Sequence, residues 1–205
     1  MARPYRWQVA AFQGFTLLGT NATAALPSLS NLLSRADAGM PLTFAIGNLG
    51  PEGLALLTNV LTRAKPSLRD GAALSLGLHY AEATMALPAL IRCVERGGAS
   101  YDVLGAIGRI GGENPRLVPA LQAWLDTTNM PPGVEFDDSM AILILGLQGP
   151  RARAAIPALR SRYLQASAAG DLNDCKLLRR VLKNIAPNDN LLPPPGPGEN
   201  STEWP

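Results

Sequence analysis

The stretch MALPALIRCV, residues 85–94, has the composition of an apolar helix and yet carries Pro88 near its middle. Proline removes a backbone donor and clashes with the preceding turn, which costs about 3 kcal/mol in a helix interior. The same arrangement recurs in AALPSLSNLL (24–33), RLVPALQAWL (116–125) and AAIPALRSRYL (154–164). Four such placements in one chain indicate an internal repeat, and the repeat predicts the fold.

The spacing of related segments gives the length of the repeat. Pro88, Pro119 and Pro157 follow one another at intervals of 31 and 38 residues. The segment NLLSRA (31–36) returns as NVLTRA (59–64) after 28 residues, which supplies a copy that lacks the proline. The period is therefore about 30 residues with insertions, in the range of stacked helical repeats.

A second apolar segment follows each of these segments and ends at a glycine. Its copies are FTLLG (15–19), IGNLG (46–50), LSLG (74–77), IGRIG (107–111) and LILG (143–146), with KNIA (183–186) as a degenerate sixth. Because glycine adopts positive φ without strain, each ending is typical of a helix C-terminus. The predicted unit is helix, turn, helix, turn, and such units bury their apolar stripes by stacking on one another.

The segment PSLRDGAALSLG (66–77), preceded by a helix ending in LTRAK, resembles the second helix of a HEAT repeat. In that pattern a leucine and an arginine lead into an alanine pair, a leucine and a glycine, here Leu68, Arg69, Ala72, Ala73, Leu76 and Gly77. The proline-bearing segments resemble the first helix, whose internal proline bends it around the array. The resemblance covers about residues 5–187 and implies an all-α fold, an α-solenoid of about five HEAT-like helix-turn-helix repeats.

We expect one HEAT-like domain at residues 1–187 and a proline-rich disordered tail at 188–205. When the repeats are aligned in this way, the chain begins with a second helix, around residues 5–18, and the first helix of that repeat is missing. Solenoids need polar caps at their ends, and this helix is a poor one because it carries Trp7, Phe12 and Phe15. We therefore expect self-association through the N-terminal helix, or a chain that is a fragment of a longer protein.

Composition restricts the class of protein further. The chain is 47% hydrophobic but only 5% aromatic, which favours helices over strands. A net charge of +2 is too small to imply nucleic acid by itself. No apolar run reaches the roughly 18 residues of a membrane span. The cytoplasm is slightly favoured as the compartment, and export stays open if the chain is a fragment. Cys93 and Cys175 are expected to be free, buried thiols.

The sequence shows no catalytic constellation, so we expect a protein that is not an enzyme and has no cofactor and no metal. Some HEAT-like hydroxylases bind iron through several His-Glu pairs, but His79 is the only histidine in this chain. Zinc would require a cluster of ligands that is missing. A serine or cysteine nucleophile would need a base, and only His79 could serve.

One basic stripe stands out near the C-terminus. Residues 151–183 hold eight Lys or Arg and two Asp. Within the last predicted helix, basic residues fall at i, i+3, i+4 and i+7, and these are Lys176, Arg179, Arg180 and Lys183. A solvated helix face explains the stripe, and binding to an acidic protein, a nucleic acid or a lipid surface is the alternative. No aromatic residue interleaves it, which weakens stacking of single strands.

Counting back two residues from each closing glycine, or from Ala186, predicts one register of the second helices. Its members are Leu17, Asn48, Ser75, Arg109, Ile144 and Asn184. In HEAT arrays the second helices line the concave side, so this register is expected to form an exposed row there. The next residue is aliphatic in every copy, which is the helical pattern of one exposed and one buried register. Simple solvation of the row is the alternative.

These observations lead to a non-catalytic protein–protein interaction module, a scaffold or adaptor, that binds through its concave face. The expected binding residues are Asn48, Ser75, Arg109 and Asn184. The expected partner is a protein or peptide, with an acidic partner at the C-terminal repeats. A HEAT-like enzyme or nucleic-acid-binding protein that uses the basic C-terminal repeats is the competing hypothesis.

Overall fold

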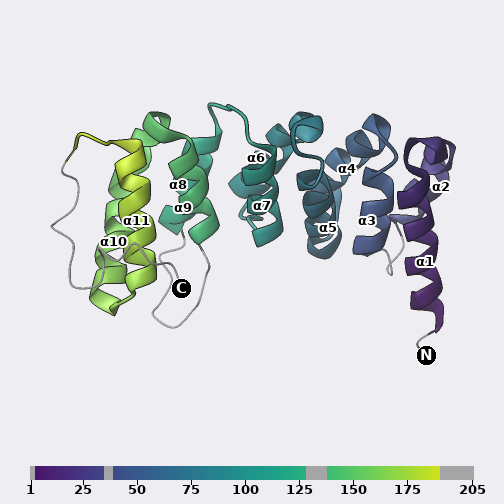
Figure 1. Cartoon of the computed structure of the whole chain (residues 1–205), viewed down its shortest axis with the longest axis horizontal. Coiled ribbons are helices and arrows are strands. Elements are labelled where there is room, and N and C mark those ends of the chain that lie inside the picture. Colours follow the sequence, from purple (N-terminus) through teal and green to yellow (C-terminus); the bar gives the residue numbers. More distant parts are fainter. Residues whose placement is uncertain (1–2, 35–38, 128–137, 190–205) are drawn as a thin grey trace. The chain divides into compact units, whose positions relative to one another are not determined.

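A computed structural model of the chain describes residues 3–34, 39–127 and 138–189. Of these residues 83% are helical and none forms a strand, so the all-α prediction is confirmed for this part of the chain. The chain divides into two compact units, residues 1–114 and 115–205 (Figure 1). The single array at 1–187 and its superhelical form stay predictions. Nearly all of the predicted tail at 188–205 lies outside the described residues.

The first unit alternates the two kinds of helix that the repeat predicts. The proposed second helices are α1 (Arg3–Leu18), α3 (Met40–Gly47), α5 (Pro66–Gly77) and α7 (Tyr101–Ile110), and the first helices are α2 (Leu26–Leu32), α4 (Pro51–Arg63) and α6 (Leu87–Glu95). Two 3₁₀ segments, η1 (Gly19–Ala25) and η2 (Tyr80–Ala86), lead directly into α2 and α6. Helix α1 packs on α3, α3 on α5 and α5 on α7, so the second helices are successive neighbours (Figure 1).

The second unit holds α8 (Leu117–Thr127), α9 (Ser139–Leu147), the 3₁₀ segment η3 (Gly149–Ala155), α10 (Ile156–Ala169) and α11 (Leu172–Ile185). Helix α11 packs on both α9 and α10, and η3 contacts α8 and α11. Cys175 is buried here and Cys93 in the first unit, and both are free thiols, as predicted. Among the described helices, none combines the length and apolar character needed to cross a membrane.

The recurrent proline lies in the first turn of an α-helix and not in a helix interior. Pro27, Pro88 and Pro157 are the second residues of α2, α6 and α10, and Pro119 is the third residue of α8. Proline is tolerated there because its missing N–H has no partner in the first turn of an α-helix. The prediction of first helices bent by an internal proline is therefore wrong. In three of the four copies the proline marks the change from 3₁₀ to α geometry.

The three 3₁₀ segments share a sequence pattern with a period of three. Each begins at a residue with positive φ, which is 54° at Gly19, 46° at Tyr80 and 55° at Gly149. Alanines follow three and six residues later in every copy, at Ala22 and Ala25, Ala83 and Ala86, and Ala152 and Ala155. A 3₁₀-helix has three residues per turn, so each pair of alanines lies on one face. The last four of these alanines are 0% exposed, and the first two are half-buried.

The turn after each of the helices α1, α3, α5, α7 and α9 lies at a residue with positive φ, and this residue is not always the predicted glycine. The turn residues are Gly19, Gly50, Tyr80, Gly111 and Gly149. The endings LSLG and LILG predict turns at Gly77 and Gly146, but both turns come three residues later. Those two glycines permit close helix packing instead. A Cβ on Gly77 would lie 2.9 Å from Cα of Ala106 in α7, and one on Gly146 would lie 2.9 Å from Cγ2 of Val181 in α11.

Candidate functional site

The predicted polar row is only partly exposed. Arg109 and Asn184 are exposed and Asn48 is half-buried, but Ser75 is buried, with 1% of its surface exposed. The Ser75 hydroxyl donates a hydrogen bond to the carbonyl oxygen of Thr43 in α3, at 3.1 Å. The expectation that Ser75 belongs to an exposed row is therefore wrong. Ser75 lies in the contact between α3 and α5, because the count that selected it started three residues before the true turn.

Counting back two residues from the positive-φ turn residue gives a consistent register in the first unit. We call it the turn register, and its members are Leu17, Asn48, Leu78 and Arg109. Leu17 is 89% exposed and Leu78 is 49% exposed. In the second unit, the same count from Gly149 gives the exposed Leu147 in place of the buried Ile144. The register thus reaches solvent in each of these copies and mixes apolar with polar side chains.

The two polar members of the turn register offer different chemistry. Asn48 donates from Nδ2 to the carbonyl oxygen of Phe44 at 2.8 Å, and its side-chain oxygen remains an acceptor. Arg109 is a cation near the carboxylate of Asp102 on the same helix. Burial raises the pKa of Asp102, the negative charge of Asp70 raises it further, and the positive charge of Arg109 opposes both.

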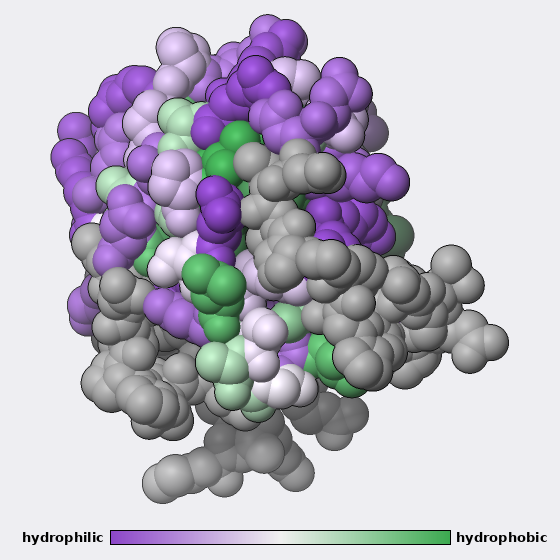
Figure 2. All heavy atoms as spheres, turned by 90° about the vertical axis from the view of Figure 1, so that its left-hand side faces the viewer, coloured by the Kyte–Doolittle hydropathy of each residue, from purple (hydrophilic) through white to green (hydrophobic). Residues whose placement is uncertain are grey.

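The predicted basic stripe lies on α11, and one of its members is used inside the fold. Arg179 donates to the hydroxyl of Tyr163 at 2.5 Å, and its guanidinium carbon lies 5.2 Å from the centre of the Tyr163 ring. Tyr163 is only 2% exposed, so this cation–π contact fastens α11 to α10. Arg180 and Lys183 are exposed and Lys176 is half-buried. The described surface at this end is mostly hydrophilic, and hydrophobic residues gather in a strip near its middle (Figure 2).

A small pocket lies in the first unit where the C-terminal ends of α4 and α6 meet the start of α5. Its volume is about 110 Å³. Its lining consists of Leu61, Thr62, Ala64, Arg69, Arg92, Cys93, Arg96 and Gly98. Three of the lining residues are arginines and none is acidic, so we call it the arginine pocket. None of the predicted binding residues lines it.

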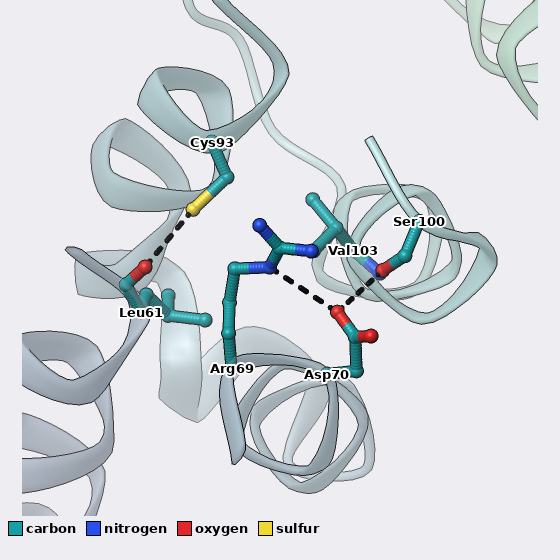
Figure 3. A network of polar contacts seen from close by, with 6 residues as sticks. All are labelled: Leu61, Arg69, Asp70, Cys93, Ser100 and Val103. Atoms are coloured by element: carbon teal, nitrogen blue, oxygen red, sulfur yellow. Dashed lines mark hydrogen bonds and ion pairs between the residues drawn. The ribbon is translucent and has the colours of Figure 1, made fainter. Parts of the chain in front are cut away.

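Arg69 is paired with its neighbour Asp70 in α5, and the Asp70 carboxylate is in turn bound by Ser100 of the next repeat. Its Nε donates to Oδ1 of Asp70 at 3.2 Å, and the same oxygen accepts a hydrogen bond from the Ser100 hydroxyl at 2.8 Å (Figure 3). Ser100 in turn caps α7, because its Oγ accepts from the N–H of Val103 at 3.3 Å. A Cβ on Gly98 would lie 2.5 Å from Nη1 of Arg69. The Gly98 backbone therefore lies close to the guanidinium, and a larger residue there would require the end of the Arg69 side chain to move.

The cysteine in the arginine pocket is a structural thiol. Cys93 donates from Sγ to the carbonyl oxygen of Leu61 at 3.3 Å. Burial raises the pKa of this thiol, and the positive charges of Arg69, Arg96 and Arg92 oppose that rise without reversing it. The thiol therefore stays protonated at neutral pH, whereas a nucleophilic cysteine needs its thiolate form.

The other titratable groups of the described residues form no recognised reaction centre. His79 is half-buried, and its Nδ1 lies 3.9 Å from Oε2 of Glu82, which is itself exposed. Within residues 3–34, 39–127 and 138–189, no three His, Cys, Asp or Glu side chains are grouped so that they could hold a metal ion.

Sequence reasoning did not find the arginine pocket, because its arginines come from different repeats. Arg69 lies near the start of α5, whereas Arg92 and Arg96 follow it by 23 and 27 residues, in and just after α6. One signal was available in the sequence, since two arginines four residues apart at a helix end lie on one face.

Comparisons with known proteins supply no family assignment for the chain. No protein-family model matches it, and no curated protein or solved structure shows significant similarity to it. The resemblance to HEAT repeats therefore rests on the motifs quoted above.

Proposed function

We propose that this chain is a non-catalytic interaction module of the HEAT-like type, which binds an extended segment of a partner protein along its turn register. One observation supports this proposal above others. In four consecutive second helices the residue two before the turn reaches solvent, and two of these four residues are leucines. Single exposed leucines are ordinary on protein surfaces. Leucines that recur at equivalent positions of stacked helices form a regular surface suited to a regular ligand.

The spacing of the register matches an extended peptide. Packed helices lie about 8–10 Å apart, and an extended chain rises about 3.3 Å per residue. Each step from one second helix to the next therefore corresponds to about three residues of ligand. The expected ligand carries apolar side chains opposite Leu17 and Leu78, a polar group opposite Asn48 and a carboxylate opposite Arg109. Arginine suits the last position because its guanidinium binds a carboxylate with two parallel hydrogen bonds.

The competing proposal, an enzyme or a nucleic-acid-binding protein that uses the basic end, has weaker support. Arg179 packs on Tyr163 and is engaged within the fold. An acidic partner at α11 would depend on Lys176, Arg180 and Lys183.

Peptide selection on the full chain tests the proposal. Peptides selected from a random library are titrated against the protein and its variants, with binding followed by fluorescence anisotropy. We expect Leu78→Ser and Arg109→Gln each to weaken binding by about tenfold or more. Both side chains reach solvent, so the melting temperature should change little, since exposed substitutions usually alter stability by less than about 0.5 kcal/mol.

Matched control variants are available in the same unit. Met85 is 56% exposed on η2, and Arg63 is exposed at the end of α4, and neither belongs to the turn register. Met85→Ser and Arg63→Gln should leave binding within about twofold of the native protein. Selected peptides that bind equally well to Leu78→Ser, Arg109→Gln and the native chain would refute the proposal.

A further inference from the structure

We propose that the arginine pocket binds a phosphate monoester group. This inference is independent of the turn register, because the two sets of residues do not overlap. It rests on the charge, the size and the construction of the pocket.

The charges of the pocket match a phosphate dianion. Arg69 is paired with Asp70, which cancels one positive charge. Arg92 and Arg96 have no hydrogen bond or ion pair from their side chains within the described residues, and no acidic residue lines the pocket. The three arginines and Asp70 therefore carry a local net charge of about +2. A phosphate monoester carries about −1.5 to −2 at neutral pH, whereas a carboxylate carries −1.

The arrangement of donors also favours a tetrahedral group. The guanidinium groups come from the start of α5, from α6 and from the loop after α6, and one guanidinium is enough to hold a planar carboxylate. Arg69 bonds to Asp70 through Nε, so its two terminal nitrogens remain donors for a ligand in the pocket (Figure 3). The pocket volume of about 110 Å³ is well above the roughly 10–15 Å³ that a cavity needs to hold one water molecule. This is room for one phosphate group.

Helix electrostatics alone does not explain the pocket. Cations are favourable near a helix C-terminus, which accounts for Arg92 in the last turn of α6. Arg69 lies near the start of α5, where a positive charge opposes the helix dipole. The hydrogen bond to Asp70 nevertheless orients Arg69 beside the pocket, with its side chain only 20% exposed. A preorganised guanidinium beside two other cations is the construction expected of an anion site.

Calorimetric titration of the full chain with inorganic phosphate tests the inference, in a phosphate-free buffer of low ionic strength. We expect saturable binding, and we expect Arg92→Gln and Arg96→Gln each to weaken it by about tenfold, which corresponds to about 1.4 kcal/mol. Arg63→Gln is the matched control, because Arg63 ends α4 near the pocket without lining it. This control should keep the affinity within about twofold. Circular dichroism verifies that every variant is folded.

Further probes separate the sources of the phosphate group. O-phosphoserine in a short peptide represents a modified protein, and a hexose phosphate represents a small metabolite. Tighter binding of either probe than of inorganic phosphate supports the inference and identifies the source. The inference is overturned if inorganic phosphate does not bind, if acetate binds as tightly as phosphate, or if Arg92→Gln and Arg96→Gln bind phosphate like the Arg63→Gln control.

Discussion

A hydrogen bond of 2.8 Å, donated by the Ser100 hydroxyl to Asp70, joins two neighbouring repeats. Ser100 is the N-cap of α7, and Asp70 lies in α5. The hydroxyl therefore has two functions, because its oxygen also accepts from the N–H of Val103. The Ser100 side chain thus caps the N-terminus of α7 and also binds α5, which is the second helix of the preceding repeat.

Replacing Ser100 by alanine should lower stability more than the loss of an ordinary cap. Loss of an N-cap costs about 0.5–2 kcal/mol, and the Asp70 carboxylate also loses a partner in a half-buried site. We expect a loss of about 2 kcal/mol, measured by urea unfolding. Ser67→Ala is the control, because Ser67 is exposed within α5, and it should change stability by less than about 0.5 kcal/mol. Equal losses of stability from the two substitutions would contradict the role of Ser100 in linking α5 to α7.

The surroundings of Gly77 and Gly105 differ, so replacement by alanine should have opposite effects on stability at the two positions. Gly77→Ala places a methyl group 2.9 Å from the backbone of Ala106, and such overpacking typically costs about 1–3 kcal/mol. At Gly105, inside α7, the new Cβ would meet only the far end of Arg109, at 3.9 Å. Gly105→Ala should therefore gain about 0.5–1 kcal/mol from helix propensity. Thermal unfolding of both variants checks this, and stabilisation by Gly77→Ala would show that α5 and α7 are farther apart.

The turn at Gly149 allows backbone strain to be measured without a steric clash. Its φ is 55°, and a Cβ there would meet no atom within 4 Å. Gly149→Ala should therefore destabilise the protein by about 1–2 kcal/mol through the left-handed backbone alone. Gly14→Ala in α1 meets no atom within 4 Å either, and should stabilise by about 0.5–1 kcal/mol. A neutral Gly149→Ala would mean that this turn does not have positive φ in solution.

Sequence periodicity predicted the alternation of helices because apolar spacing reports directly on helix faces. It placed the prolines in helix interiors because the apolar run continues through the 3₁₀ segment without a break. The alanines at period three, such as Ala83 and Ala86 before Pro88, are the signal that distinguishes 3₁₀ from α geometry here.

The prediction of which residues of the second helices are exposed was wrong in two copies, α5 and α9, for a different physical reason. Glycine is selected both for positive φ and for close helix contact, and a sequence does not separate the two uses. At Tyr80 the turn residue is not a glycine at all, so the conspicuous glycine nearby was the packing residue Gly77. The complete arginine pocket was not predicted because Arg69 and Arg92 come together only when two repeats pack on each other, although the spacing of Arg92 and Arg96 indicated part of it.

Asp102 predicts a dependence of stability on pH. Burial and the charge of Asp70 raise its pKa in the folded state above the unfolded value of about 3.9. The ionised carboxylate therefore disfavours folding at neutral pH, and this effect disappears as the pH falls through the folded pKa and below the unfolded one. We expect Asp102→Asn to be more stable than the native chain at pH 7 and equally stable near pH 3. Lower stability of Asp102→Asn at pH 7 would show that the carboxylate favours folding.

The end of α1 predicts self-association of the chain. Leu17 is 89% exposed and the adjacent Leu18 is 55% exposed. The residues equivalent to Leu18 in later copies, Leu49 and Ile110, are buried. Covering such side chains removes apolar surface from water, which contributes about 25 cal/mol per Å². Light scattering across a range of concentrations should therefore show a dimer, and Leu18→Ser should shift it toward the monomer.

Leu18 separates this prediction from peptide binding, because it lies next to the turn register and not in it. Leu164 is a matched control, since it is 59% exposed on α10 in the other unit. Leu164→Ser should leave the association unchanged, while Leu18→Ser weakens it and leaves peptide binding intact. A native chain that stays monomeric at the highest concentration would refute self-association, whatever the outcome of the peptide experiment. The predicted contribution of Trp7 concerns a side chain outside those that the structure describes.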